Sequence, residues 1–198
     1  MSELVLASRS RARLAILRAA GLPVRAVAAD VDEESIRAAC RAGGEGAEAT
    51  ALALARAKAR KVAAGGTSAL VVGADQILDC EGVWFGKPRD RVDAADQLRR
   101  LCGRTHRLVT GISLMGQAHE IWHHCEIATM SMVALDEGAV ARYLDAAGEA
   151  ALESVGAYQV EGPGIGLFDR VEGDYFSILG LPLVPLVGAL RRHGLTIP

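Results

Sequence analysis

The sequence has no excess of basic charge. Its 198 residues include 22 Lys and Arg against 24 Asp and Glu, which leaves a formal net charge of −2. Proteins that bind nucleic-acid phosphates without regard to sequence usually carry a positive excess, because the attraction is electrostatic. We therefore expect no bulk nucleic-acid binding.

Long hydrophobic runs are also missing. The chain has no uninterrupted apolar stretch of about 18 residues, the length at which a membrane helix becomes a candidate. The N-terminus runs directly into a Ser/Arg cluster and lacks the charged, apolar and cleavage regions of a signal peptide. These absences predict a cytoplasmic protein without a membrane partner.

Cysteine is scarce, and its spacing carries no signal. The four cysteines lie far apart in the sequence without a C-x-x-C pair. This pattern indicates neither a disulfide framework nor a structural zinc site. We expect idle or buried thiols at Cys40, Cys80, Cys102 and Cys125.

What remains is a chain rich enough in apolar residues to bury a core of its own. Half of the composition (51%) is hydrophobic, and 198 residues are close to the usual size of one domain. No internal repeat, low-complexity tail or linker interrupts it. We expect a single domain spanning residues 1–198, with one lobe or two.

The hydrophobic periodicity predicts alternating strands and helices. Strands are expected at 4–7, 24–31, 69–73, 107–115, 119–135 and 167–171. Helices are expected at 11–20, 34–41, 48–63, 92–101 and 183–192, and a further helix is capped by Asp136 and runs to residue 147. Residues 155–166 are glycine-rich and predict a loop. This order favours an α/β fold with helices packed on a mixed sheet.

The first polar segment follows the first predicted strand and opens the first helix. Ser8 and Ser10 offer hydroxyl groups, Arg13 adds a guanidinium, and the free N–H groups of a helix N-terminus face the same space. Such a group can hold a phosphate. Taken alone, it is better explained as a serine N-cap with solvated arginines.

A carboxylate ends the apolar run at 69–73. Burying Asp75 unpaired at the end of such a strand is costly, so it should hold a metal, meet a cation or act as a base. The alternative is an aspartate that caps the next turn.

A second acidic group stands at residues 30–34, after a predicted strand. Glu33 is the candidate metal ligand here, and a few carboxylates suit Mg²⁺, which keeps several waters and bridges to substrate phosphates. Solvation at the start of a helix explains any one of these acids equally well.

Two lysines complete the candidate set. Lys87 lies between Gly86 and Pro88, which restrict the loop and allow its ammonium to meet a phosphate. Lys58 lies on the alanine-rich helix 48–63, most of whose cations we expect to be solvated. The Walker A pattern G-x-x-x-x-G-K-[ST] is absent, so this is not a P-loop.

One motif points elsewhere. Residues His119 to His123 match H-E-x-x-H, which binds zinc when a helix places both histidines on one face. Here the pattern falls in a predicted strand, where residues four apart are separated by about 13 Å. We reject a metalloprotease and expect surface histidines on a hairpin.

Taken together, these segments resemble the Maf family of nucleoside triphosphate pyrophosphatases over nearly the whole chain. The matching segments, in order, lie at residues 6–10, 30–33, 55–59, 73–76, 86–88, 101–106, 110–111, 172–176 and 180–183. The resemblance implies hydrolysis between the α- and β-phosphates with Mg²⁺ or Mn²⁺. It also implies two lobes around a cleft and a homodimer.

The resemblance also implies roles for individual residues. Asp75 is similar to the general base or metal-linked carboxylate, and Glu33 to its metal partner. The phosphate ligands would be Ser8, Arg13, Lys58 and Lys87, together with Ser10.

The chain departs from common Maf patterns in three places. Ala12 stands where many members have the first of two arginines, and Glu161 stands where an amide often contacts the substrate. Gln76 follows Asp75 where the branch acting on dTTP and UTP commonly has threonine. Gln76 and Glu161 are therefore the candidate base contacts, and the pattern is more similar to the branch acting on 7-methyl-GTP.

Two other functions compete with hydrolysis to monophosphate and pyrophosphate. One is a nucleotide-binding regulator of cell division or septum formation that binds triphosphate without turnover. The other is a phosphatase or nucleotidyltransferase that uses the same phosphate ligands. The reaction products distinguish all three.

Overall fold

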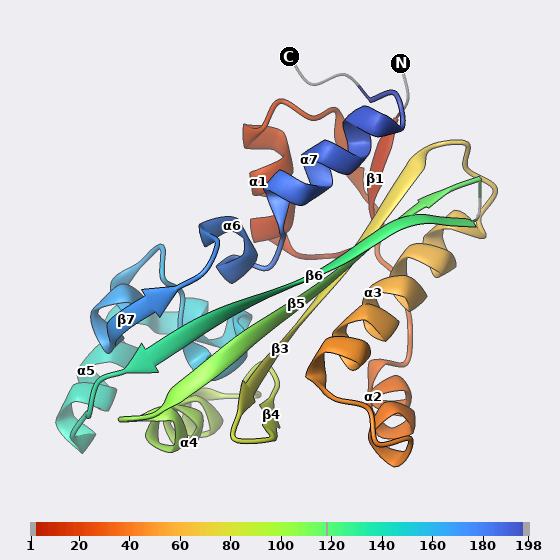
Figure 1. Cartoon of the computed structure of the whole chain (residues 1–198). Helices are drawn as coiled ribbons and strands as arrows, with labels where there is room; N and C mark the ends of the chain where they lie inside the picture. Colours follow the sequence, from red (N-terminus) through yellow and green to blue (C-terminus); the bar gives the residue numbers. More distant parts are fainter. Residues whose placement is uncertain (1–2, 118, 196–198) are drawn as a thin grey trace. The chain divides into compact units, whose positions relative to one another are not determined.

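The computed structural model describes residues 3–117 and 119–195 (Figure 1), and they divide into two compact units. Among these residues, we call unit 1 the part formed by residues 3–76, 110–117, 119–126 and 174–195, and unit 2 the part formed by residues 77–109 and 127–173.

Strands and helices alternate along the chain. The strands are β1 (Leu4–Leu6), β2 (Val24–Ala26), β3 (Leu70–Cys80), β4 (Val83–Phe85), β5 (Thr105–Gly116), β6 (His119–Met132) and β7 (Phe168–Glu172). The α-helices are α1 (Arg11–Ala19), α2 (Glu33–Ala42), α3 (Ala47–Ala63), α4 (Arg91–Leu101), α5 (Glu137–Ala147), α6 (Tyr175–Ile178) and α7 (Leu183–Arg192). Short 3₁₀ helices are η1 (Gly148–Glu153), η2 (Val155–Ala157) and η3 (Pro163–Leu167).

The strand pairing confirms the predicted mixed sheet. In unit 1, β1 runs parallel to both β2 and β3, with Leu4 opposite Val24 and Leu70. In unit 2, β4 pairs antiparallel with β3, and β7 pairs antiparallel with β6. Helices flank the strands, as the α/β prediction requires (Figure 1).

The pleat of β1 and β3 sorts side chains between two helical layers in unit 1. Leu4 and Leu6 pack into a core with α1 and α7, which lie side by side in Figure 1. Val5 and Val71 belong to a second core that includes alanines of α3. Successive side chains of a strand point to opposite faces, so odd-numbered residues of β3 in unit 1 face α3.

Gly73 lets α3 pack very close to β3. A Cβ atom at this position would lie 2.2 Å from the Ala55 carbonyl oxygen and 2.8 Å from the Ala59 nitrogen. Both obstacles are helix backbone, which cannot turn aside as a flexible side chain can. The alanines that make α3 alanine-rich therefore allow this helix to pack closely against the sheet.

Gly73→Ala is expected to destabilise the protein by about 3 kcal/mol or more, because α3 must move away from β3. Urea unfolding followed by circular dichroism measures this loss. Gly166→Ala is the control, since a Cβ atom there meets nothing within 4 Å. Equal stability of the two variants would contradict the close packing.

Unit 2 has its own buried centre. His106 is 1% exposed, and its Nε2 lies 2.7 Å from the Tyr158 hydroxyl, while the Phe168 ring packs edge-on against Tyr158. Burial lowers the pKa of His106 to about 4, so this imidazole stays neutral near pH 7. Its neutral ring packs near the rings of Tyr158 and Phe168 in this centre.

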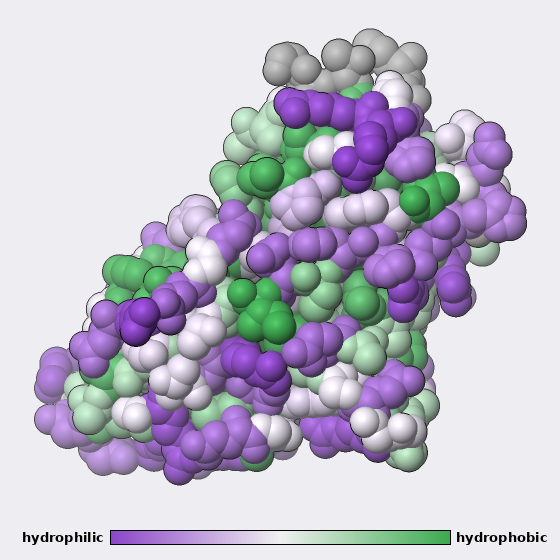
Figure 2. Space-filling model, in the orientation of Figure 1, coloured by the Kyte–Doolittle hydropathy of each residue, from purple (hydrophilic) through white to green (hydrophobic). Residues whose placement is uncertain are grey.

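The surface carries the polar residues that the cores exclude. On the face drawn in Figure 2, hydrophobic residues form small groups separated by hydrophilic ones. In the described ranges 3–117 and 119–195, no helix is both long and apolar enough to span a bilayer.

Several expected elements differ from the structure. The strand expected at 69–73 continues to Cys80. Asp75 was predicted to lie at the end of this strand, and it lies inside β3. The strand expected at 24–31 ends at Ala26. The sequence analysis missed β4 and α6, and the loop expected at 155–166 contains short 3₁₀ turns.

Candidate functional site

Asp75 is the centre of a charged cluster in unit 1. Its carboxylate is 4% exposed and lies on the side of β3 that faces α3. Lys58 of α3 places its Nζ atom 2.5 Å from Asp75 Oδ1. The packing of α3 against Gly73 brings this helix close enough for a lysine one turn after Ala55 to reach the strand.

Lys58 is itself buried, at 8% exposure. The expectation that most cations of its helix are solvated therefore does not hold for this lysine. A buried ammonium needs charged or polar partners, because water no longer compensates it. Its partners are Asp75 and, at 2.8 Å, Glu33 Oε1.

Glu33 is the first residue of α2, directly after the N-cap Asp32. Burial opposes ionisation of its carboxyl, but the hydrogen bond and charge of Lys58, with the charges of Arg37 and Arg13, outweigh burial and lower the pKa of Glu33. Glu33 and Asp75 therefore meet at one shared ammonium, that of Lys58. Their predicted role as a pair of metal ligands stays a prediction.

Arg37 is a cluster member that the sequence analysis missed. Its Nη2 atom lies 3.0 Å from Asp75 Oδ2 and 3.8 Å from Glu33 Oε2. Residues four apart on a helix share a face, so the spacing from Glu33 was a signal that could have identified it. With Lys58 on Oδ1 and Arg37 on Oδ2, both oxygens of Asp75 have a cation.

Arg13 lies beside the same carboxylates and is fixed by backbone. Its Nε donates to the Gly180 carbonyl at 2.7 Å, and its Nη1 donates to the Ala74 carbonyl at 2.9 Å. Gly180 has φ +93°, and a Cβ atom there would lie 3.3 Å from Arg13 Nε. Burial lowers the pKa of Arg13, while the charges of Asp75 and Glu33 oppose this shift.

Ser8 and Ser10 organise the turn before α1. Ser10 is the N-cap, and its Oγ accepts from the Arg13 backbone N–H at 3.3 Å. Ser8 Oγ accepts from the Ser10 N–H at 3.1 Å and lies 3.5 Å from Arg13 Nη1. The capping interpretation thus describes their contacts, and phosphate binding by the two hydroxyls stays a prediction.

Gln76 points to the face of β3 opposite Asp75. Its Nε2 donates to Thr110 Oγ1 and to the Ser177 carbonyl, both at 3.0 Å, and lies 3.2 Å from the Ile178 carbonyl. The amide therefore ties β3 to β5 and α6. Its predicted contact with a base remains untested.

Two predicted residues, Lys87 and Glu161, belong to unit 2, whereas the cluster belongs to unit 1. Lys87 is exposed between β4 and α4, and Glu161 is exposed in the turn before η3. Their predicted contacts with substrate stay predictions.

The H-E-x-x-H segment lies in β6, as predicted from its surroundings. Glu120 of this motif accepts from Arg56 Nε at 2.9 Å and from Ser113 Oγ at 2.8 Å. Its carboxylate therefore links β6 to β5 and to α3. The contacts are those of a structural ion pair.

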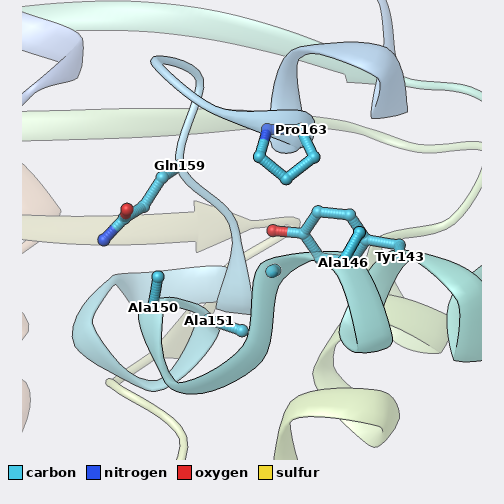
Figure 3. Close-up of a pocket in the computed structure, with 7 residues that line it drawn as sticks. Tyr143, Ala146, Ala150, Ala151, Gln159 and Pro163 are labelled. Carbon is cyan, nitrogen blue, oxygen red and sulfur yellow. The ribbon is translucent and has the colours of Figure 1, made fainter.

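A small cavity in unit 2 (Figure 3) contains none of the predicted residues. Tyr143, Gln159 and Pro163 line it, and alanines of α5 and η1 complete much of the wall. Burial raises the pKa of Tyr143 to about 12, and its hydroxyl donates to the Ala157 carbonyl. This cavity offers no nucleophile or base near neutral pH.

The cluster in unit 1 brings two carboxylates, those of Glu33 and Asp75, to one ammonium. Among residues 3–117 and 119–195, no three His, Cys, Asp or Glu side chains are grouped to hold a metal by themselves. Mg²⁺ characteristically takes one or two carboxylates and fills its other positions with water and phosphate oxygens. Glu33 and Asp75 fit that requirement.

The lowered pKa of Glu33 predicts a loss of stability in acid. A carboxyl whose folded-state pKa lies below its unfolded value of about 4.5 stabilises the fold above that pH and loses this contribution as pH falls through the folded pKa. The stability difference between the wild type and Glu33→Gln should therefore shrink below about pH 4.5. Urea midpoints from pH 7 to pH 3 measure it, and a constant difference would contradict the assigned cause.

Comparison with known proteins gives a consistent family assignment. A family model described as "Maf-like protein" matches residues 3–193. A protein of Granulibacter bethesdensis named "Nucleoside triphosphate pyrophosphatase" is 46% identical over 96% of this chain and 97% of its own length. A protein of Brucella abortus named "7-methyl-GTP pyrophosphatase" is 45% identical over 96% of each chain.

A solved structure from Mycobacterium abscessus, titled as a nucleoside-triphosphatase and dITP/XTP pyrophosphatase, aligns with a TM-score of 0.46. It is 17% identical and covers 96% of this chain and 93% of its own.

Proposed function

This chain belongs to the Maf family, and on that premise we propose that it hydrolyses nucleoside triphosphates to the monophosphate and pyrophosphate. The observation that carries the proposal is the buried Asp75 carboxylate, which shares Lys58 with Glu33 and has Arg37 on its other oxygen. Cations and carboxylates held together in this way suit a reaction on a phosphate anhydride. The names of the Maf relatives support the same activity.

The cations would bind the triphosphate and stabilise the charge that develops on the leaving pyrophosphate. Lys58 and Arg13 are already held in place by protein partners, so little reorganisation is needed when charge develops. The start of α1, beside Ser8 and Ser10, would add a second anion-binding element through its helix dipole. Lys87 is proposed as a further phosphate ligand.

Asp75 would accept the proton of the attacking water or hold the metal that activates it. Its carboxylate is held in place by Lys58 and Arg37, and burial excludes most bulk water from it. Glu33 would complete the acidic side of the site. Water adds to the α-phosphorus, the bond to the bridging oxygen breaks, and the displaced group leaves as pyrophosphate.

We propose Mg²⁺ or Mn²⁺ as the cofactor. Glu33 and Asp75 would hold it, and the bound ion would supply charge neutralisation at the phosphate oxygens and activation of water. The hard oxygen donors support this class of metal.

The proposed substrates are modified or surplus nucleotides, with 7-methyl-GTP as the leading candidate. Relatives named for this compound support the choice, as does glutamine at position 76. A 7-methylated guanine carries a positive charge that guanine lacks, so an acidic side chain beside the base would favour it. Glu161 is the proposed acidic contact.

Glu161→Gln is expected to reduce the preference for 7-methyl-GTP over GTP, because the amide removes the attraction to the cationic base. The ratio of kcat/KM for the two substrates measures this preference in wild type and variant. An equal loss on both substrates would place Glu161 at the phosphates or metal. No change in either value would leave it as a solvent-exposed loop residue.

The experiment that tests the proposed activity is a substrate screen with product analysis. Purified protein is incubated with standard and modified triphosphates and Mg²⁺ or Mn²⁺, and the products are separated by anion exchange. Nucleoside monophosphate with pyrophosphate supports the proposal. Binding without product would favour a regulator of cell division, and orthophosphate or a transferred nucleotidyl group would favour a phosphatase or nucleotidyltransferase.

We also propose that the protein acts in the cytoplasm, where nucleoside triphosphates are abundant, and that it forms a homodimer. The resemblance to Maf proteins supports the dimer. Light scattering on the purified protein gives its mass in solution and decides between one copy and two.

A further inference from the structure

Arg37 occupies the oxygen of Asp75 that Lys58 leaves available. Lys58 Nζ lies 2.5 Å from Oδ1, and Arg37 Nη2 lies 3.0 Å from Oδ2. The same guanidinium is 3.8 Å from Glu33 Oε2. Arg37 therefore stands between the two carboxylates that would hold a divalent cation.

The two cations of Asp75 differ in how firmly they are fixed. The Lys58 side chain is 10% exposed, whereas the Arg37 side chain is 28% exposed and comes from α2, several of whose residues are exposed. Lys58 also has a second close partner in Glu33 at 2.8 Å. Arg37 is thus the cation that can leave Asp75 with the smaller loss of contacts.

We propose that Arg37 is an exchangeable counter-ion of Asp75, which a divalent cation must displace and which the triphosphate then binds. This inference rests on the proposed function, because it assumes that the cluster receives a metal and a nucleotide. The planar guanidinium of arginine matches phosphate oxygens as well as carboxylate oxygens, so the transfer exchanges the charge-assisted hydrogen bond to Asp75 for one to phosphate.

The exchange predicts that metal and nucleotide bind cooperatively. A metal ion alone must break the Arg37 contact with Asp75 and leaves the guanidinium without that partner. A metal that arrives with a triphosphate supplies both a replacement charge for Asp75 and a phosphate for Arg37. The protein should therefore bind free metal weakly and bind it much more tightly in the presence of a polyphosphate.

Mn²⁺ binding measured by electron paramagnetic resonance tests the exchange without any turnover. Arg37→Met should bind free Mn²⁺ about tenfold more tightly than the wild type, because the ion no longer competes with a guanidinium. Arg41→Met is the matched control, since Arg41 lies one turn further along α2 and is exposed. It should bind Mn²⁺ as the wild type does.

The same titration with saturating inorganic triphosphate measures the coupling. The wild type should bind Mn²⁺ more tightly when triphosphate is added. The fold-increase in Mn²⁺ affinity should be about tenfold smaller in Arg37→Met than in the wild type. Arg37→Gln provides a second variant with the same expectation if the methionine variant does not fold.

The proposal would be overturned if the wild type and both Arg37 variants bound free Mn²⁺ with equal affinity. It would also be overturned if Arg41→Met gained as much affinity for free Mn²⁺ as Arg37→Met. Failure of the proposed function has a different signature, because a protein that is no pyrophosphatase releases no monophosphate in the substrate screen whatever the Mn²⁺ titrations show.

Discussion

Asp75→Asn is expected to lower kcat by about 10³-fold or more, because the amide keeps the shape of the side chain and removes its charge. That charge is the partner of Lys58 at 2.5 Å and of Arg37 at 3.0 Å. Without it, the site would lose a base or metal ligand at its centre. Steady-state release of pyrophosphate from 7-methyl-GTP measures the effect.

Asp79→Asn is the matched control for this loss. Asp79 is a second buried aspartate of β3, at 6% exposure, and it lies in unit 2 with Arg107 as its ion-pair partner. The variant should lose stability for similar electrostatic reasons and retain turnover. Turnover near the wild-type value in Asp75→Asn would refute the role of Asp75.

Lys58→Met is expected to destabilise the fold by about 3 kcal/mol, because it leaves the buried Asp75 with Arg37 as its remaining close cation. The same variant should lose kcat/KM by an amount that corresponds to about 2–4 kcal/mol of transition-state stabilisation. Urea unfolding and initial rates measure the two losses separately.

The double variant Lys58→Met, Asp75→Asn separates electrostatics from packing. When both charges are removed, position 75 no longer holds a buried carboxylate that lacks Lys58, so part of the lost stability should return. A double variant as unstable as the sum of the two single variants would contradict an ion pair as the source of the effect.

The helices were the most predictable part of the fold. The limits of α7, Leu183–Arg192, agree with the predicted range, and α5 begins directly after its predicted cap Asp136 and ends at Ala147 as predicted. The side chains of Ser10 and Asp136 accept from backbone N–H groups at the starts of α1 and α5, as their capping positions predict. Local signals of this kind do not depend on the rest of the chain.

Strands were predicted less well because their extent depends on partners elsewhere. The polar residues Gln76 and Asp79 interrupt the apolar run, yet β3 continues to Cys80 since both side chains find partners. The short β4 carries little pattern of its own and exists through its pairing with β3.

The site shows the same division between local and tertiary information. The sequence indicated Asp75 and Glu33 as candidate site residues, because both are carboxylates that follow predicted strands. It did not identify Arg37, and it could not establish that Lys58 is buried, because that depends on which face of α3 packs against β3. The pleat of β3 and the close approach at Gly73 decide this.

The most direct test of the proposed reaction is phosphorus NMR of the products formed from 7-methyl-GTP in ¹⁸O-enriched water. Attack on the α-phosphorus predicts 7-methyl-GMP and pyrophosphate, with the ¹⁸O isotope shift on the monophosphate alone. Asp75→Asn should give neither product at a comparable rate. Release of orthophosphate, or ¹⁸O in the pyrophosphate, would contradict the account.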